Sequence, residues 1–252
     1  LGLPRPVGLL FMAMLGFYIF ALCLRVNPWL GILGAIAFGF STINILYIGA
    51  GHVTKVNAIA YMAPALGGLI LAFRGKWLIG SAVFALFFAL NLSANHLQMT
   101  YYLSFLLAAV ALSEVIRLAI KKDWIYLGKS IGALSVVSVL TIMAAASNLM
   151  TTFEYSKYTT RGTSELTLKP KGQAAKMTAK EGLNKNYILE YNFGGGEWLS
   201  LVAPNAKGGK TEILGNNEKA VEIINANPDY YQYADLLLNT DQSKPAFPSY
   251  WG

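Results

Sequence analysis

Long apolar stretches alternate with short polar junctions over the first 146 residues of the chain. Each apolar stretch is close to the roughly 20 residues that a helix needs to cross a bilayer. The uncharged run over 77–113 would make a helix of roughly 55 Å, so it must fold into two helices joined by a tight turn. The pattern predicts six membrane-spanning helices, over 7–24, 29–50, 56–73, 77–92, 98–116 and 125–146.

Residues 147–252 differ in composition from residues 1–146. They hold eleven basic and eleven acidic residues, against nine and two in the first part. The pattern predicts a helical extension, two short strands and a helical segment, over 147–158, 187–193, 198–202 and 217–238. We therefore expect a mainly α protein in which a polytopic transmembrane helix bundle (1–146) precedes a small soluble α+β segment (147–252).

Positive charge marks alternate junctions of the predicted bundle. Seven cations follow the first, third and fifth helices: Arg25, Arg74, Lys76, Arg117, Lys121, Lys122 and Lys129. The opposite side has only Arg5 and Lys55. The positive-inside rule places the seven in the cytoplasm, so both histidines and residues 147–252 are expected on the outer side. The net charge of +7 is thereby explained by topology, and we predict no nucleic-acid partner.

The predicted outer junctions carry the polar residues that could perform chemistry. Candidates for substrate binding are Lys55, Asn57, Asn95, Gln98, Tyr101, Tyr102 and, further along, Arg161. Hydrogen-bond donors, a cation and aromatic rings suit a phosphate head group or a sugar. Amides and tyrosines also cap helices and lie at membrane interfaces, and this alternative remains open.

Three residues are candidates for acid–base chemistry: His52, His96 and Glu154. The histidines have no neighbouring carboxylate or thiol, whereas zinc is held by three or four ligands, so we predict no metal site. The glycines at 194–196 are not followed by the lysine of a phosphate-binding loop, which leaves a turn as the interpretation. We predict no cofactor. Pro64, with Gly67 and Gly68, predicts a kink or a break in the third helix.

Four motifs carry a family resemblance: AGHVTK (50–55), LSANHLQMTYY (92–102), YTTRGTSEL (158–166) and the closing YWG (250–252). Together they resemble the YfhO family of bacterial multi-spanning membrane proteins. That family is longer, and the abrupt ends of this chain predict an internal fragment. The resemblance implies a GT-C-like glycosyltransferase of the bacterial inner membrane, with residues 147–252 in the periplasm. It further implies a polyprenyl-phosphate sugar donor, an envelope acceptor and a catalytic carboxylate upstream of residue 1.

Two other functions stay open at this point. Glycine-rich helices and Pro64 are also typical of a transporter or lipid-carrier flippase, in which helices move. Alternatively, residues 147–252 could serve as the docking surface of a non-enzymatic subunit in an envelope assembly. The lipid bilayer is the one partner that all three hypotheses share.

Overall fold

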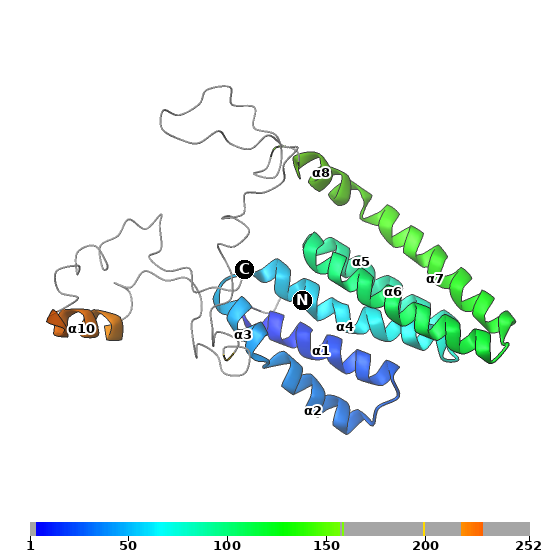
Figure 1. Cartoon of the computed structure of the whole chain (residues 1–252), viewed down its shortest axis with the longest axis horizontal. Helices are drawn as coiled ribbons and strands as arrows, with labels where there is room; N and C mark the ends of the chain where they lie inside the picture. The colour runs from blue at the N-terminus through cyan, green and yellow to red at the C-terminus, as the bar shows by residue number, and fades with distance from the viewer. Residues whose placement is uncertain (1–3, 157, 159–198, 200–217, 229–252) are drawn as a thin grey trace. The chain divides into compact units, whose positions relative to one another are not determined.

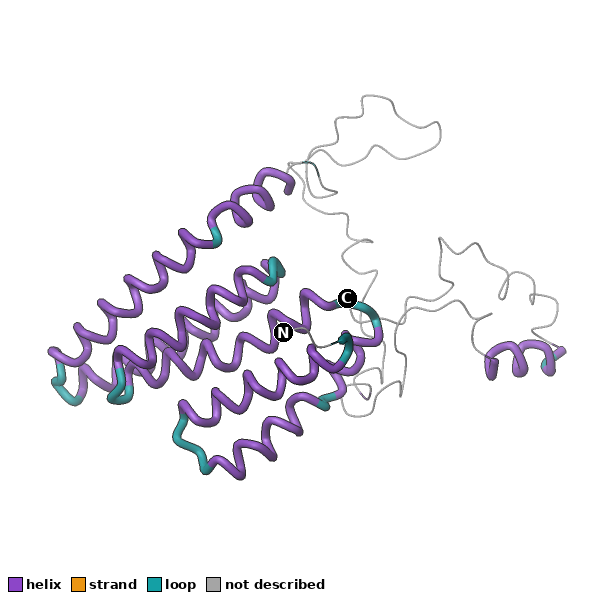
Figure 2. Tube along the Cα trace, turned by 180° about the vertical axis from the view of Figure 1, so that it is seen from behind, coloured by secondary structure: helices purple, strands orange, loops and turns teal. Residues whose placement is uncertain are grey.

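The computed structural model describes residues 4–156, 158, 199 and 218–228. The chain forms two compact units, Leu1–Gly182 and Leu183–Gly252. Figure 2 shows only helices and loops in the described residues. The helices of the first unit are α1 (Val7–Cys23), α2 (Pro28–Gly39), α3 (Thr42–Gly49), α4 (Val53–Phe73), α5 (Trp77–Ser93), α6 (Leu97–Ile120), α7 (Trp124–Ala144) and α8 (Ala146–Ser156). The second unit contains α10 (Glu218–Ala226).

Helix α4 is the central helix of the first unit and packs between α1 and α5 (Figure 1). Its most apolar stretch is 67% buried, whereas the corresponding stretches of α6 and α7 are only 22% buried. Large exposed apolar faces of this kind are unfavourable in water and suit contact with lipid. In the described residues, α4, α6 and α7 are long and apolar enough to cross a membrane, and the bent pair α2–α3 could be a fourth span.

Small residues allow α4 to approach its neighbours closely. A methyl group added at Gly80 of α5 would overlap the backbone nitrogen of Ala72, and one added at Gly68 would overlap that of Phe84. Backbone contact of this kind is typical of membrane helix pairs. Gly16 of α1 similarly lies against the carbonyl of Ala60.

Helix α4 continues through Pro64, so the predicted break does not occur, and the alternative of a kink stays a prediction. Proline lacks the N–H that would bond to the carbonyl of Ala60 four residues earlier. Gly16 leaves room for that carbonyl against α1. The neighbouring helix thus accommodates the proline without interrupting α4.

The predicted continuous helix over 29–50 is instead two helices, α2 and α3, bent by 43°. At this break the side-chain Nδ2 of Asn44 donates to the carbonyl of Phe38 at 2.8 Å. A carbonyl that accepts a hydrogen bond from a side chain no longer requires the backbone N–H four residues later that would continue the helix. The predicted extension beyond 146 is likewise a separate helix, α8, after an interruption at Ala145.

Short turns with one repeated geometry join the helices. Arg25, Gly51, Gly75, Asn95 and Lys122 all have positive φ, and each lies just after a helix end. A residue in this left-handed conformation allows the N–H of the next residue to donate to a carbonyl in the last turn of the helix. After Gly75, for example, the N–H of Lys76 donates to the carbonyl of Leu71. The helices that these turns join are therefore antiparallel, as Figure 1 shows, whereas α3 follows α2 across a bend and α8 continues from α7.

The second part of the chain is described only in small portions. Helix α10 lies within the predicted helical segment 217–238 and ends before Pro228. The two predicted strands, over 187–193 and 198–202, lie outside the described residues except for Leu199. The α+β class and the domain boundary at 146 therefore stay predictions.

Candidate functional site

The antiparallel helices place their turns at two opposite ends of the first unit. The basic end comprises the turns 24–27, 74–76 and 121–123, and the histidine end comprises the turns 50–52 and 94–96. The guanidinium of Arg25 donates to the carbonyl of Arg74 at 3.3 Å, which links two of the basic turns. His96 and Lys121 cap opposite ends of α6, which at 1.5 Å per residue are about 36 Å apart. The predicted separation of histidines from basic turns is confirmed; which end faces the cytoplasm stays a prediction.

Lys55 lies buried at the histidine end, in the first turn of α4, with only 6% of its surface exposed. Its Nζ lies 4.5 Å from the centroid of the Tyr47 ring of α3. The ring face partly compensates the charge. Tyr47 also meets His52 edge-on, with 6.3 Å between ring centroids. In the described part of the chain, no carboxylate forms an ion pair with Lys55.

The two histidines are the N-cap residues of α4 and α6. Burial lowers the pKa of His52, and the positive charges of Lys55 and His96 lower it further. Burial and the charge of Lys55 also lower the pKa of His96. Both imidazoles are therefore neutral at pH 7 and can donate or accept a hydrogen bond. Lys55 and His52 both lie against the Tyr47 ring, and the charge of Lys55 acts on both histidines, so we call His52, Lys55 and His96 the histidine cluster.

Within this cluster, the Nδ1 atom of His96 is buried without a hydrogen-bond partner in the described residues. A buried polar atom is normally bonded, so a bonding group is expected there from a ligand or a solvent molecule. Among the described residues, no three histidine, cysteine or acidic side chains gather as a metal site would require. The cluster therefore offers one cation and two neutral imidazoles.

Asn95, another predicted binding residue, joins the α5–α6 turn to α8. Its Oδ1 accepts a hydrogen bond from Thr152 Oγ1 at 3.2 Å. Glu154 is exposed on α8, two residues beyond Thr152, and residues two apart on a helix do not share a face. Arg161 lies outside the described residues. The catalytic role of Glu154 and the binding role of Arg161 stay predictions.

The remaining predicted residues make local contacts. Asn57 is half-buried and lies two positions after Lys55, on a different face of α4. Gln98 Nε2 donates to the hydroxyl of Tyr102 at 3.1 Å on an exposed part of α6. Tyr101 is exposed beside it. Their part in substrate binding stays a prediction.

Sequence reasoning missed a buried hydrogen-bonded pair close to the histidine cluster. Asn91 of α5 donates to the carbonyl of Ala58 at 3.0 Å and accepts from Thr100 Oγ1 at 2.8 Å. The pair joins α4, α5 and α6 just inside the turn. One signal could have predicted this pair: Asn91 and Thr100 are polar residues on either side of a turn in an uncharged run.

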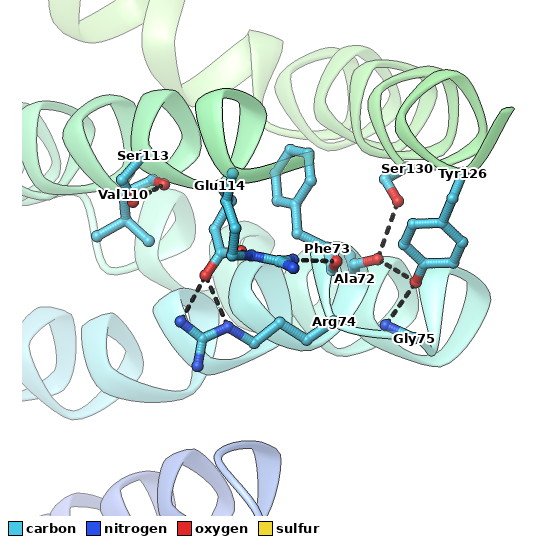
Figure 3. Close-up of polar contacts among 10 residues, drawn as sticks. Ala72, Phe73, Arg74, Gly75, Val110, Ser113, Glu114, Tyr126 and Ser130 are labelled. Atoms are coloured by element: carbon cyan, nitrogen blue, oxygen red, sulfur yellow. Dashed lines mark hydrogen bonds and ion pairs between the residues drawn. The ribbon is translucent and has the colours of Figure 1, made fainter. Parts of the chain in front are cut away.

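Sequence reasoning also missed an ionic network at the basic end (Figure 3). Glu114 of α6 is 2% exposed and accepts from Arg74 Nε and Arg117 Nε, each at 2.6 Å. An acid inside an apolar helix is by default expected to have a partner. Glu114 is the first acidic residue of the chain and lies three positions before Arg117. That spacing could have predicted the pair.

The fold and the site together define a class: a helical protein with several apolar helices of membrane-spanning length and a cationic cluster at one end. No protein-family model, no curated protein and no solved structure matches the chain. The YfhO resemblance therefore stays a prediction.

Proposed function

We propose that this chain is a membrane-embedded part of a GT-C-like glycosyltransferase. In this proposal it moves a sugar from a polyprenyl-phosphate carrier to a cell-envelope acceptor at the outer face of a bacterial inner membrane. The supporting observation is the histidine cluster, in which Lys55 is buried against the Tyr47 ring, His52 meets the same ring, and the charge of Lys55 acts on both histidines. The family resemblance of the surrounding motifs supplies the reaction class.

A phosphate is the group that this cluster would bind best. A buried cation without a counter-ion is unfavourable and gains from an anionic ligand. His52 and His96 begin α4 and α6, so the positive ends of both helix dipoles lie at the cluster. Neither helix has an acidic residue in its first turn to compensate that dipole. In the proposal, Lys55 holds the carrier phosphate and the histidines position its oxygens.

The location of the cluster also suits a lipid-linked substrate. In the proposal, six segments cross the membrane: α4, α6 and α7, the bent pair α2–α3, and the shorter helices α1 and α5. Each of the last two has 17 residues, at the lower limit of a membrane span. The histidine cluster would then lie near the outer interface, at the depth of a carrier phosphate.

The test is sugar transfer by the protein reconstituted in liposomes, with a radiolabelled polyprenyl-phosphate sugar as donor. We expect Lys55→Ala and His96→Ala each to reduce transfer at least tenfold, the change produced by a loss of about 1.4 kcal/mol. Lys122→Ala, which removes the same charge from the basic end, is the matched control and should keep full transfer.

Two results would reject the proposal. Unchanged transfer in both cluster variants would remove Lys55 and His96 from the mechanism. Movement of a labelled carrier lipid between leaflets, without sugar transfer by the unaltered protein, would instead indicate a flippase.

A further inference from the structure

Side chains from other helices hold the end of α4 in place at the basic end (Figure 3). The last carbonyls of a helix have no donor within that helix. Here Tyr126 and Ser130 of α7 both donate to the carbonyl of Ala72, at 2.7 and 3.0 Å. Arg117 Nη2 of α6 donates to the carbonyl of Phe73 at 2.9 Å. These bonds tie the end of α4 to α6 and α7.

A cavity of about 410 Å³ lies at this corner, within the size range of small-molecule sites. Its lining residues are Phe73, Arg74, Gly75, Arg117, Leu118, Lys121, Asp123 and Tyr126. Three of these are cations, and the only acid among them, Asp123, accepts from the backbone N–H of Tyr126 at 3.3 Å as the cap of α7. The lining carries a net positive charge.

The ionic network orients the two arginines and leaves donors unused. Arg74 uses Nε and Nη2 for Glu114, and Arg117 uses Nε for Glu114 and Nη2 for Phe73. In the described residues, the Nη1 group of neither arginine makes a hydrogen bond. The side chains of Arg74 and Arg117 are 56% and 33% exposed, so solvent and solutes can reach them. Fixed guanidinium groups with free donors suit phosphate oxygens.

Apolar side chains surround the same turn. Ile120, Trp124 and Ile125 are all more than half exposed, and they flank Lys121 and Asp123 in the chain. Tryptophan is enriched at the boundary between head groups and hydrocarbon. Basic pockets between helices at a membrane surface bind the head groups of anionic lipids. We propose that this cavity binds the phosphate of an anionic phospholipid, with the acyl chains along the exposed faces of α6 and α7.

The experiment uses the whole chain in phosphatidylcholine vesicles that contain phosphatidylglycerol with a photoreactive group on its glycerol head. We expect crosslinks in the segment 117–126, located by mass spectrometry. Lys121→Gln should reduce the yield about fivefold, a change of about 1 kcal/mol, because Lys121 lines the cavity and its charge would contact the phosphate. Lys122→Gln removes an adjacent charge that does not line the cavity and should leave the yield unchanged, and Lys121→Arg should restore it.

Competition distinguishes the two sources of phosphate. Unlabelled phosphatidylglycerol should suppress the crosslink, and phosphatidylcholine at the same concentration should not. Suppression by millimolar glycerol phosphate alone would overturn the assignment to a lipid, because a soluble phosphate would then suffice. Equal losses in Lys121→Gln and Lys122→Gln would indicate a diffuse basic surface and would overturn the site.

Discussion

The two ends of the first unit differ in whether their buried charged side chain has a partner of opposite charge. At the basic end, Glu114 pairs with two arginines and side chains satisfy the last carbonyls of α4. At the histidine end, Lys55 is buried against a tyrosine ring, and no described carboxylate pairs with it. At the basic end the buried charge of Glu114 is paired, whereas at the histidine end the buried charge of Lys55 has no described carboxylate as partner. A group that costs stability in the free protein is expected to be retained for binding.

The largest effect is expected from removing the carboxylate at the basic end. Glu114→Gln keeps the size of the side chain but removes the charge, so Arg74 and Arg117 repel each other at the end of α4. Breaking a buried ion pair costs about 3–5 kcal/mol; because both arginines reach solvent, we expect the lower value, about 3 kcal/mol, in the free energy of unfolding. Denaturant unfolding in detergent micelles measures it.

Glu154→Gln is the control for this prediction. Glu154 is an exposed carboxylate on α8, and the same substitution there should change the free energy of unfolding by less than about 0.5 kcal/mol. If Glu114→Gln and Glu154→Gln were equally mild, the network at the basic end would contribute nothing measurable to stability.

A change of opposite sign is expected at the histidine end. Lys55→Met keeps an unbranched side chain one atom shorter and removes the buried charge, which pairs with no described carboxylate. The free energy of unfolding should increase by about 1 kcal/mol, since an apolar replacement of a buried charge is often neutral or stabilising. Binding of polyprenyl phosphate, measured on the same samples, should fall. Destabilisation of more than about 1 kcal/mol would show that Lys55 is a structural residue, and the contrast between the ends would disappear.

How much of this could be predicted from sequence depends on the range of the interaction. Helix ends followed from local signals, because charged residues and turns interrupt the apolar runs, and α5 (Trp77–Ser93) lies within one residue of its prediction over 77–92. The separation of the two ends followed from charge alternation alone. The break between α2 and α3 could not be predicted in this way. It coincides with a hydrogen bond from the Asn44 side chain to a backbone carbonyl, which the sequence does not reveal.

Contacts between distant segments could not be predicted. Tyr47 of α3, beyond the unpredicted bend, meets Lys55 of α4, and Thr152 meets Asn95 across 57 residues of chain. The cavity at the basic end likewise depends on α6 and α7 converging on the end of α4. Sequence indicates which residues lie at the same depth, but the partner of each side chain is set by helix rotation and packing.

The smallest effect is expected from titrating the histidine cluster. His52 and His96 are the only histidines in the chain, and the pKa of each lies below its ordinary value of about 6.5. As pH falls through about 6.5, the unfolded chain takes up protons before the folded chain does, so stability falls until the folded pKa values are passed. Melting temperature measured between pH 8 and 5.5 should therefore decrease, and His52→Gln/His96→Gln should flatten the profile. Bound polyprenyl phosphate should weaken the decrease in the unaltered protein, because an anion beside the imidazoles favours their protonated form. An identical pH profile with and without polyprenyl phosphate would show that the histidines take no part in binding the phosphate.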